Sequence, residues 1–469
     1  MSILVINSGS SSVKIDLLDA RSGRRDAVVR VERVGTAQCL AHLEGRDPIP
    51  LPGANHGAAL EVVLPLLDTT RVEAVGHRGV HGGERFTRAT VIDDAVISAI
   101  EALAGLAPLH TPANLAAIRA ARALLPQVPH VAVFDTAFHA TLPHRAQMYA
   151  LPRAIAEKHG LRRYGFHGTS HAWVAARAAE YLEAPIEELR IITCHLGNGA
   201  SVCAVEYGRS VETSMGLTPL EGLVMGTRVG DIDPGILLEL MRREGWSVDE
   251  LDRFLNEDCG LAGLSGVGND MRDIERRAAE GDEACRAALH VFTHRVRKYI
   301  GAYAAVMGGV DAIVFTGGIG ENSALVRHRV AQRLDFLGAR IDEDANRDAK
   351  VDRESPVADI SRARGRVRLL VVATDEAHAI AREVDAALTA ARPGRGAIPI
   401  AVSARHVHLT QEAVEALFGA GHRLTPRNPL SQPDQYACEE TVDLVGPKGR
   451  IDHVRVLGPT RPACQVEVS

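Results

Sequence analysis

A run of small hydroxyl residues ending in a lysine follows the first apolar stretch of the chain, and it has the composition of a phosphate-binding turn. Residues 5–14 read Val-Ile-Asn-Ser-Gly-Ser-Ser-Ser-Val-Lys. Small residues let backbone N–H groups approach phosphate oxygens closely, the hydroxyl groups add donors, and Lys14 supplies a positive charge. A solvated hairpin turn is the alternative, because Gly/Ser turns are common.

This turn is not a Walker loop. The segment from Gly9 to Lys14 lacks a second glycine before the lysine, and a strand pattern follows it where a Walker loop requires a helix. Apolar residues 3–6 and the alternating Val13, Ile15 and Leu17 predict the two strands of a hairpin. A nucleotide bound here would therefore be held by a different architecture.

Three further glycine-rich segments, residues 195–201, 265–272 and 316–323, predict ligand-binding loops. The first and the last each follow a predicted strand, and neither completes the G-x-G-x-x-G pattern of a dinucleotide site. Each alone is typical of a tight turn. Together with the first turn, they suit opposite walls of a cleft that holds the phosphates and base of ATP.

Composition limits the classes of partner. A chain of 469 residues that is 46% hydrophobic can bury several cores, and its length predicts about three domains. A net charge of −6 and a pI near 6.4 argue against binding to nucleic acid or to an anionic membrane. The seven scattered cysteines form no CxxC pair, and the chain shows no signal pattern or membrane-length apolar run. We therefore expect a soluble, cytoplasmic protein with reduced thiols.

The predicted strands and helices that position these loops alternate along the chain, which predicts an α/β fold. Buried strands are predicted at 74–76, 131–134, 190–194 and 312–315. Each strand leads into a loop with glycine, histidine or aspartate, the usual place for active-site residues in such folds. Helical periodicity covers residues 58–67, 95–106, 172–182, 234–244, 283–307 and 377–390. The Arg/Pro/Gly-rich residues 391–397 then predict an interdomain linker.

Long motifs along most of the chain resemble those of the acetate kinase family, in order and at its spacing. They are VINSGSSSVK (5–14), GHRGVHGGERF (76–86), APLHTPAN (107–114), VFDTAFH (133–139), RRYGFHGTSH (162–171), CHLGNGASV (194–202), ETSMGLTPLEGLVMGTRVGDIDP (212–234) and VFTGGIGENS (314–323). The resemblance covers residues 1 to about 393. It implies two actin-like ATPase domains with a cleft between them. Residues 1–139 with 378–391 would form the first domain and residues 140–377 the second, followed by a linker at 392–397.

The resemblance implies reversible in-line transfer of the ATP γ-phosphoryl group to acetate, giving acetyl phosphate and ADP. Such chemistry needs alignment and cations where charge accumulates. Arg78 and Arg228 would hold the acetate carboxylate and the phosphoryl oxygens; surface ion pairing is the alternative for both. His167 would stabilise the phosphoryl group in flight. Asp135 would orient the arginine and the substrate, because a carboxylate nucleophile has no proton to remove.

The same resemblance implies the ligand-binding residues. Asn7 and Glu376 would bind Mg²⁺ or Mn²⁺, although the usual Asn-Glu-Glu run is Asp-Glu-Ala here, so Asp375 could share that role. A small apolar pocket for the acetate methyl group would comprise Val80, Leu109 and Pro219. The residues expected around the nucleotide are Lys14, His195, Leu196, Gly197, Asn198, Gly199, Asp270, Met271, Arg272, Gly318, Ile319, Gly320, Glu321 and Asn322.

Other functions remain open at this point. One methylene changes binding by only about 1 to 3 kcal/mol, so propionate or another short-chain acid could be the acceptor. A catalytically inactive, actin-like ATP-binding regulator is the second alternative. Family precedent also implies a homodimer.

Residues 398–469 predict a separate, small, mainly β half-barrel domain. Its first strand would place His406 and His408 on one face, a spacing that suits zinc. Its motifs, LTP (424–426), LSQP (430–433), VGPKG (445–449), VLGPTR (456–461) and QVEV (465–468), resemble the first half of a PduL-type phosphotransacylase. That resemblance implies zinc ligands at His406, His408 and Glu467 and a phosphate contact at Arg461. Because the second half of that family's site is missing, we expect loose zinc binding and no transacylase activity without a partner.

Overall fold

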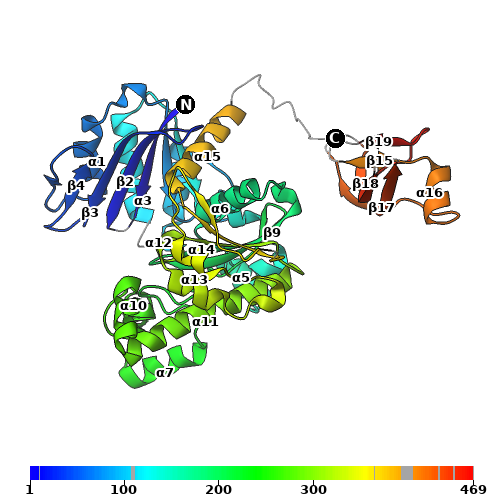
Figure 1. Ribbon diagram of the computed structural model, residues 1–469. Helices are drawn as coiled ribbons and strands as arrows, with labels where there is room; N and C mark the ends of the chain where they lie inside the picture. The colour runs from blue at the N-terminus through cyan, green and yellow to red at the C-terminus, as the bar shows by residue number, and fades with distance from the viewer. Residues whose placement is uncertain are drawn as a thin grey trace. The chain divides into compact units, whose positions relative to one another are not determined.

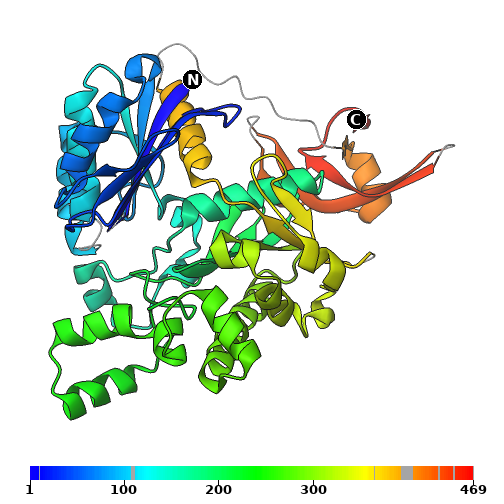
Figure 2. The same ribbon diagram turned by 60° about the vertical axis from the view of Figure 1, so that its left-hand side comes forward.

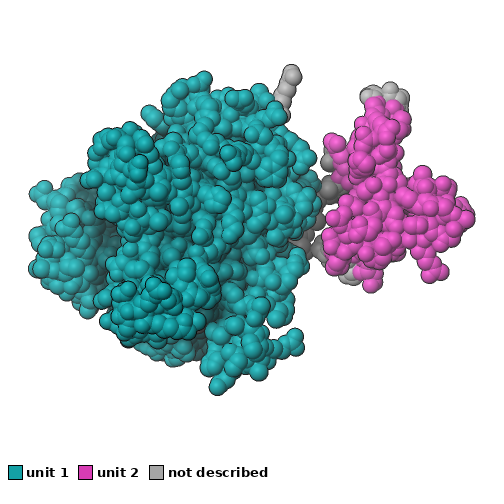
Figure 3. Space-filling view, turned by 90° about the horizontal axis from the view of Figure 1, so that it is seen from below, with its two compact units in different colours: residues 1–389 teal, residues 390–469 magenta. Residues whose placement is uncertain are grey.

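A computed structural model describes residues 1–9, 11–106, 111–363, 365–391, 405–430, 434–446 and 449–467. The chain divides into two compact units, residues 1–389 and 390–469 (Figure 3). The predicted linker at 392–397 lies outside the described residues, as does Leu109. The larger unit contains two α/β halves, each built around its own sheet (Figures 1 and 2).

The first sheet has the strand order β5-β4-β3-β2-β1-β6-β8-β7. Its strands are β1 (Ser2–Ser8), β2 (Ser12–Asp19), β3 (Arg25–Glu32), β4 (Leu40–Leu43), β5 (Ile49–Pro50), β6 (Ala74–Gly79), β7 (Thr90–Val91) and β8 (His130–Phe134). The predicted hairpin is confirmed, because β1 and β2 pair antiparallel with Asn7 opposite Lys14. Strands β1, β6 and β8 run parallel, so their carboxyl ends lie at the same edge.

Helices cover both faces of the first sheet because β1 is apolar on both sides. Leu4 and Ile6 pack into a core with α1 (His56–Val63) and α3 (Thr111–Leu124). Ile3 and Val5 point the other way and pack against α15 (Glu376–Ala390), which lies along this sheet in Figure 1. A strand buried on both faces is typical of the parallel part of an α/β sheet.

The second sheet has the order β11-β10-β9-β12-β14-β13. Its strands are β9 (Arg190–Leu196), β10 (Ala200–Glu206), β11 (Arg209–Thr213), β12 (Ala312–Thr316), β13 (Val357–Asp359) and β14 (Arg368–Val372). Strands β9, β12 and β14 are parallel. The long helix α11 (Glu283–Val306) packs on one face and α6 (Gly168–Tyr181) on the other.

The other α-helices of the larger unit are short connections or lie around the second sheet. They are α2 (Asp94–Ala102), α4 (His144–Gln147), α5 (Arg153–His159), α7 (Pro234–Glu244), α8 (Val248–Arg253), α9 (Gly260–Ser265), α10 (Met271–Glu280), α12 (Gly317–Asn322), α13 (Ala324–Ala331) and α14 (Glu343–Asp348). The described helices include none with the length and apolar character needed to cross a bilayer.

The structure changes two of the predicted elements. The predicted helix 58–67 ends as an α-helix at Val63, because Pro65 cannot donate the next helical hydrogen bond, and a 3-10 turn (Leu64–Leu66) follows. Residues 316–323 were expected to form a loop, but residues 317–322 form α12. Its first turn is tied by the Gly317 N–H, which donates to the Glu321 carboxylate at 3.0 Å.

The smaller unit is a five-stranded sheet with one helix, which confirms its mainly β character. The strand order is β16-β17-β18-β15-β19. The elements are β15 (His406–His408), α16 (Gln411–Phe418), β16 (Pro426–Pro429), β17 (Tyr436–Gly446), β18 (Gly449–Gly458) and β19 (Gln465–Glu467). The first strand expected for this unit would cover residues 398–410; of these, residues 405–410 are described, and β15 covers His406–His408.

Candidate active site

Three polar side chains meet at the carboxyl ends of the parallel strands of the first sheet. Asn7 is the last residue but one of β1, Arg78 is the last but one of β6, and Asp135 directly follows β8. Arg78 donates to both carboxylate oxygens of Asp135, at 2.9 and 2.6 Å, and to Asn7 Oδ1 at 3.1 Å. Asp135 is 2% exposed, so this ion pair is held in one orientation. Burial would lower the pKa of Arg78, but the Asp135 carboxylate raises it above its ordinary value.

Glu376 joins this group from the first residue of α15. Its carboxylate accepts a hydrogen bond from Asn7 Nδ2 at 3.1 Å. Burial alone would raise the pKa of Glu376, but the charge of Arg78, with contributions from His195 and Lys14, lowers it. The carboxylate therefore stays ionised beside the Asn7 amide, and a pair of oxygen donors of this kind fits Mg²⁺.

The β9–β10 hairpin brings its turn against the two remaining predicted catalytic residues. Gly199 has no side chain, and a Cβ atom built there would lie 3.3 Å from His167 Nε2 and 3.6 Å from Arg228 Nη1. The imidazoles of His167 and His195 lie 4.3 Å apart between ring centroids. The lack of a side chain at Gly199 therefore lets the hairpin turn approach His167 and Arg228 closely.

His167 lies at the N-terminal end of α6 in a left-handed backbone conformation, with φ of 58°. Its Nδ1 atom lies 2.9 Å from Ser201 Oγ, which lies 2.8 Å from His171 Nε2. His171 Nδ1 is in turn 2.7 Å from Thr193 Oγ1. Burial, together with the nearby His195, lowers the pKa of His167 well below its ordinary value, so its imidazole is neutral at physiological pH.

Arg228 and the residues predicted around the acetate methyl group are also close together. The Arg228 guanidinium donates to the Pro219 carbonyl at 3.2 Å, and burial lowers its pKa. Val80 is buried and packs in the same core as Phe166 and Met225. The third predicted pocket residue, Leu109, is outside the described part of the chain.

The predicted nucleotide residues occupy four places. Leu196 ends β9, and Gly197 and Asn198 lead into the Gly199 turn; Asn198 Oδ1 accepts from Asn269 Nδ2 at 2.8 Å. Gly318, Ile319, Gly320, Glu321 and Asn322 belong to α12. Asp270 caps α10 just before Met271 and pairs with the exposed Arg272 at 2.6 Å. Lys14 is exposed on β2, across from Asn7.

Glu321 has a different environment from the one expected. Its carboxylate accepts hydrogen bonds from the N–H groups of Gly317 and Thr374, at 3.0 and 2.9 Å. It therefore links α12 to the segment that leads into α15. The Glu321 side chain therefore has a structural role at the site, and its Oε1 atom already accepts two backbone hydrogen bonds.

Several residues around the site were not predicted from the sequence. Arg25 donates to both oxygens of Asp375, at 2.6 and 3.2 Å, and to Asp16 at 2.6 Å. The only signal in the sequence was the unusual aspartate at position 375. Ser201 and His171, which contact His167 directly or in series, were not singled out either.

In the smaller unit, His406 and Glu467 lie opposite each other on the paired strands β15 and β19. The rings of His406 and His408 lie 5.0 Å apart, and His408 Nδ1 lies 3.3 Å from the Leu457 carbonyl. Arg461 donates to Gln465 at 3.1 Å. Across the described residues, no three His, Cys, Asp or Glu side chains are grouped as metal ligands would be.

Comparison with known proteins gives two family matches. Residues 2–382 match the acetokinase family, and residues 399–469 match phosphate propanoyltransferase. The chain is 49% identical over 396 residues to the acetate kinase of Halothermothrix orenii and 50% identical over 396 residues to that of Thermotoga maritima. Each alignment covers 82% of this chain and 98% of the relative.

Solved structures agree with these matches. The crystal structure of Porphyromonas gingivalis acetate kinase is 42% identical, with a TM-score of 0.77 over 82% of this chain and 99% of that one. A propionate kinase from Francisella tularensis is 39% identical, with a TM-score of 0.76 over 81% and 98%. These likenesses confirm the predicted fold class of the larger unit.

Proposed function

Because this chain belongs to the acetokinase family and has acetate kinase activity, we propose that the residues gathered around the Gly199 turn carry out the reaction. An acetate oxygen attacks the γ-phosphorus of ATP in line with the departing ADP oxygen, and the reverse reaction uses the same site. The approach of Gly199 to His167 and Arg228 carries this proposal. The Gly199 turn lies beside both the Arg228 cation and the His167 imidazole, which can serve as an N–H donor, and phosphoryl transfer requires such groups where charge accumulates.

The two arginines have different tasks in this proposal. Arg78 is fixed by Asp135 and binds the acetate carboxylate, so the nucleophile is oriented before transfer. Among the described residues, Arg228 forms no ion pair with a carboxylate, and its guanidinium can bind the equatorial oxygens of the moving phosphoryl group. Asp135 acts as a positioning residue, because acetate carries no proton to remove.

His167 donates a hydrogen bond to the phosphoryl group as a neutral imidazole. We assign the directions of this series so that the hydroxyl of Thr193 donates to His171 Nδ1, His171 Nε2–H donates to Ser201, and Ser201 donates to His167 Nδ1. With contacts of 2.7, 2.8 and 2.9 Å, this assignment puts the proton of His167 on Nε2. That nitrogen faces the Gly199 turn.

Asn7 and Glu376 fit a divalent cation through their amide and carboxylate oxygens, and we assign Mg²⁺ to them. When bound there with ATP, the cation would neutralise phosphate charge. Asp375 is left out of this proposal because both of its oxygens accept hydrogen bonds from Arg25, whereas the described hydrogen bond to Glu376 occupies only one of its oxygens. Asn7 Oδ1 accepts from Arg78 at 3.1 Å, a hydrogen bond that the cation would replace.

Detection of acyl phosphate as its hydroxamate, with acetate, ATP and Mg²⁺, tests the site assignment when applied to variants. We expect Arg78→Ala and Arg228→Ala each to lose about 10³-fold or more in kcat/KM. Near-normal turnover in either variant would refute its assigned role. Relative kcat/KM values for acetate, propionate and butyrate would identify the preferred acceptor. The measurement is needed because contact of each added methylene group with the apolar pocket changes binding only modestly.

The assembly proposed for this enzyme is a homodimer. Helix α7 has no buried residue, and it exposes Ile236 and Leu238 by 46% and 53%. A second copy of the chain would cover this apolar helix. Sedimentation at micromolar concentration should give twice the chain mass, and Ile236→Asp with Leu238→Asp should give the monomer.

Residues 399–469 are proposed to supply only part of a phosphotransacylase site. His406, His408 and Glu467 would hold zinc once a further ligand is added, together with groups that hydrogen-bond to the ligating side chains and orient them. A coupled assay for acetyl-CoA from acetyl phosphate and coenzyme A should therefore give no product with these 469 residues alone. Product formation would contradict the proposal.

A further inference from the structure

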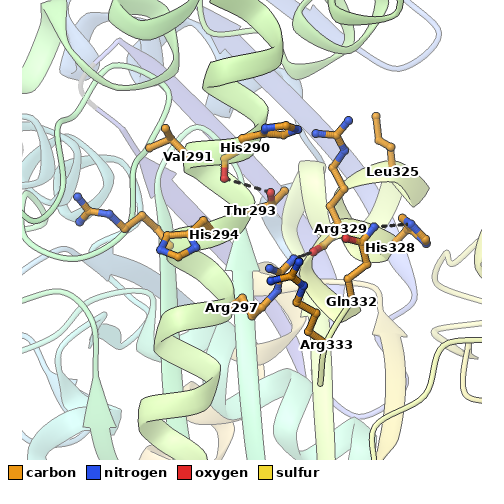
Figure 4. Close-up of a pocket in the computed structure, with 11 residues that line it drawn as sticks. His290, Val291, Thr293, His294, Arg297, Leu325, His328, Arg329, Gln332 and Arg333 are labelled. Atoms are coloured by element: carbon orange, nitrogen blue, oxygen red, sulfur yellow. Dashed lines mark hydrogen bonds between the residues drawn. The ribbon is translucent and has the colours of Figure 1, made fainter. Parts of the chain in front are cut away.

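The long helix α11 and the segment around α13 enclose a strongly cationic pocket that contains no residue of the proposed active site. Its volume is about 970 Å³. Four arginines, Arg295, Arg297, Arg329 and Arg333, line it together with three histidines, and no aspartate or glutamate does. Figure 4 shows these side chains reaching in from both elements. So many cations in one pocket are unusual in a chain whose net charge is −6.

Two of these arginines form no ion pair within the described part of the molecule. Arg329 Nη1 is buried and has no hydrogen-bond partner there. The nearby charge of Glu275 interacts with Arg329, but the Glu275 carboxylate hydrogen-bonds to Ser323 and not to Arg329. Arg333 is exposed at the end of α13, with φ of 66° and no ion pair among the described residues.

The other two arginines are held in place. Arg297 donates to the carbonyls of Val330 and Arg329, the first at 3.1 Å, which ties α11 to the end of α13. Burial, and then the positive charge of Arg333, lowers the pKa of Arg297. Arg295 lies 3.7 Å from Asp231. One wall of the pocket is therefore fixed, and the positive charges in it repel one another. A bound anion would reduce this repulsion.

We propose that this pocket binds a small multivalent oxyanion of the phosphate class. Guanidinium groups bind such oxygens in pairs, and His290 and His294 can add single N–H donors. The third histidine, His328, already contacts Glu343 and Gln332, each at 2.7 Å. The volume is at the upper end of the range for small-molecule sites, so a compact oxyanion would occupy only the part beside the arginines. The unpaired Arg329 and Arg333 would make the main contacts beside Arg297, whose guanidinium donates to the Arg329 carbonyl and lies within electrostatic range of Arg333 (Figure 4).

Titration calorimetry of the full chain with inorganic pyrophosphate, at constant ionic strength, tests this proposal. The active site also attracts phosphates, so Arg78→Ala/Arg228→Ala is the background in which the pocket is measured. We expect that background to retain saturable binding of one pyrophosphate per chain. Adding Arg329→Gln/Arg333→Gln should weaken this binding at least tenfold, and Arg333→Gln alone should weaken it measurably.

A matched control removes two charges elsewhere. Arg119 and Arg347 are exposed and paired with Glu101 and Asp344. Arg119→Gln/Arg347→Gln should leave the affinity unchanged if the pocket is the site. Equal weakening by this control would show a non-specific effect of net charge and would overturn the proposal. It would also be overturned if the background showed no saturable binding, or if binding survived loss of both Arg329 and Arg333 in a folded variant.

Discussion

Ser201 sets the orientation of the His167 imidazole, so its hydroxyl should matter to catalysis although it is fully buried in the fold. It lies between His167 Nδ1 and His171 Nε2. We expect Ser201→Ala to lower kcat by about tenfold to 100-fold, because His167 can then carry its proton on either nitrogen. The KM values for acetate and ATP should stay nearly constant.

The tautomer can be observed directly. Imidazole ¹⁵N chemical shifts should place the His167 proton on Nε2 in the parent protein and on both nitrogens in Ser201→Ala. An unchanged kcat, or a tautomer that does not respond, would show that Ser201 only fills space.

Asp375 and Glu376 are neighbours with separate roles, and substitution should distinguish them. The Arg25–Asp375 ion pair is nearly buried, with side chains 8% and 13% exposed. We expect Asp375→Asn to lower the free energy of unfolding by about 1.5 to 3 kcal/mol, because it weakens a charged hydrogen bond. The Mg²⁺ concentration that gives the half-maximal rate should not change in Asp375→Asn.

Glu376→Gln is the matched substitution one residue away. It should raise the Mg²⁺ concentration for half-maximal rate by about tenfold or more, since it removes a charged oxygen ligand. Urea unfolding and Mg²⁺ titration of the initial rate measure both effects. The reverse pattern would make Asp375 the metal ligand.

Among the secondary-structure elements, the β9–β10 hairpin has a glycine, Gly199, where a side chain would press against catalytic residues. Gly199 does not need a left-handed backbone, so alanine is compatible with its conformation. The added methyl group would contact His167 and the Arg228 guanidinium. We expect Gly199→Ala to lower kcat/KM by about 100-fold, because displacement of these donors disturbs transition-state contacts. The melting temperature should change little.

Gly301→Ala provides the control for this substitution. Gly301 lies in α11, and a Cβ atom there would meet nothing within 4 Å. It should retain full activity and gain slight stability from the better helix propensity of alanine. If Gly199→Ala were as active as Gly301→Ala, the hairpin turn would not border the reacting groups.

The strands and most helices could be predicted because their apolar periodicity is local. Helix α12 could not, since its Gly-Gly-Ile-Gly sequence has a low helix propensity. Contacts of Glu321 with Gly317 and Thr374 stabilise it, and the second of these comes from distant sequence. Likewise, nothing near Asp375 in the sequence indicates Arg25, which lies 350 positions away. The site chemistry was predictable from motifs, but the contacts that orient it are tertiary.

On the scale of the whole kinase unit, buried histidines couple stability to pH. Burial lowers the pKa of His81 and of His139 to about 4, and it lowers those of His77, His167 and His171 well below the ordinary value. In the unfolded chain these groups bind protons near pH 6.5. Below that pH the unfolded state therefore binds more protons than the folded state, and stability falls as pH falls.

The loss should begin near pH 6.5 and continue to about pH 4. A pKa shift from 6.5 to about 4 corresponds to up to about 3 kcal/mol for His81 and for His139, a large part of a typical folding free energy. We expect urea unfolding to show a steep decrease in stability between pH 6.5 and 5. Calorimetric unfolding at pH 5.5 in buffers of different ionisation enthalpy should show uptake of several protons per chain. His139→Gln should reduce that uptake by about one proton, because glutamine does not titrate. A free energy of unfolding that stays constant from pH 7 to 5, or unfolding without proton uptake, would mean that these histidines titrate normally in the folded enzyme.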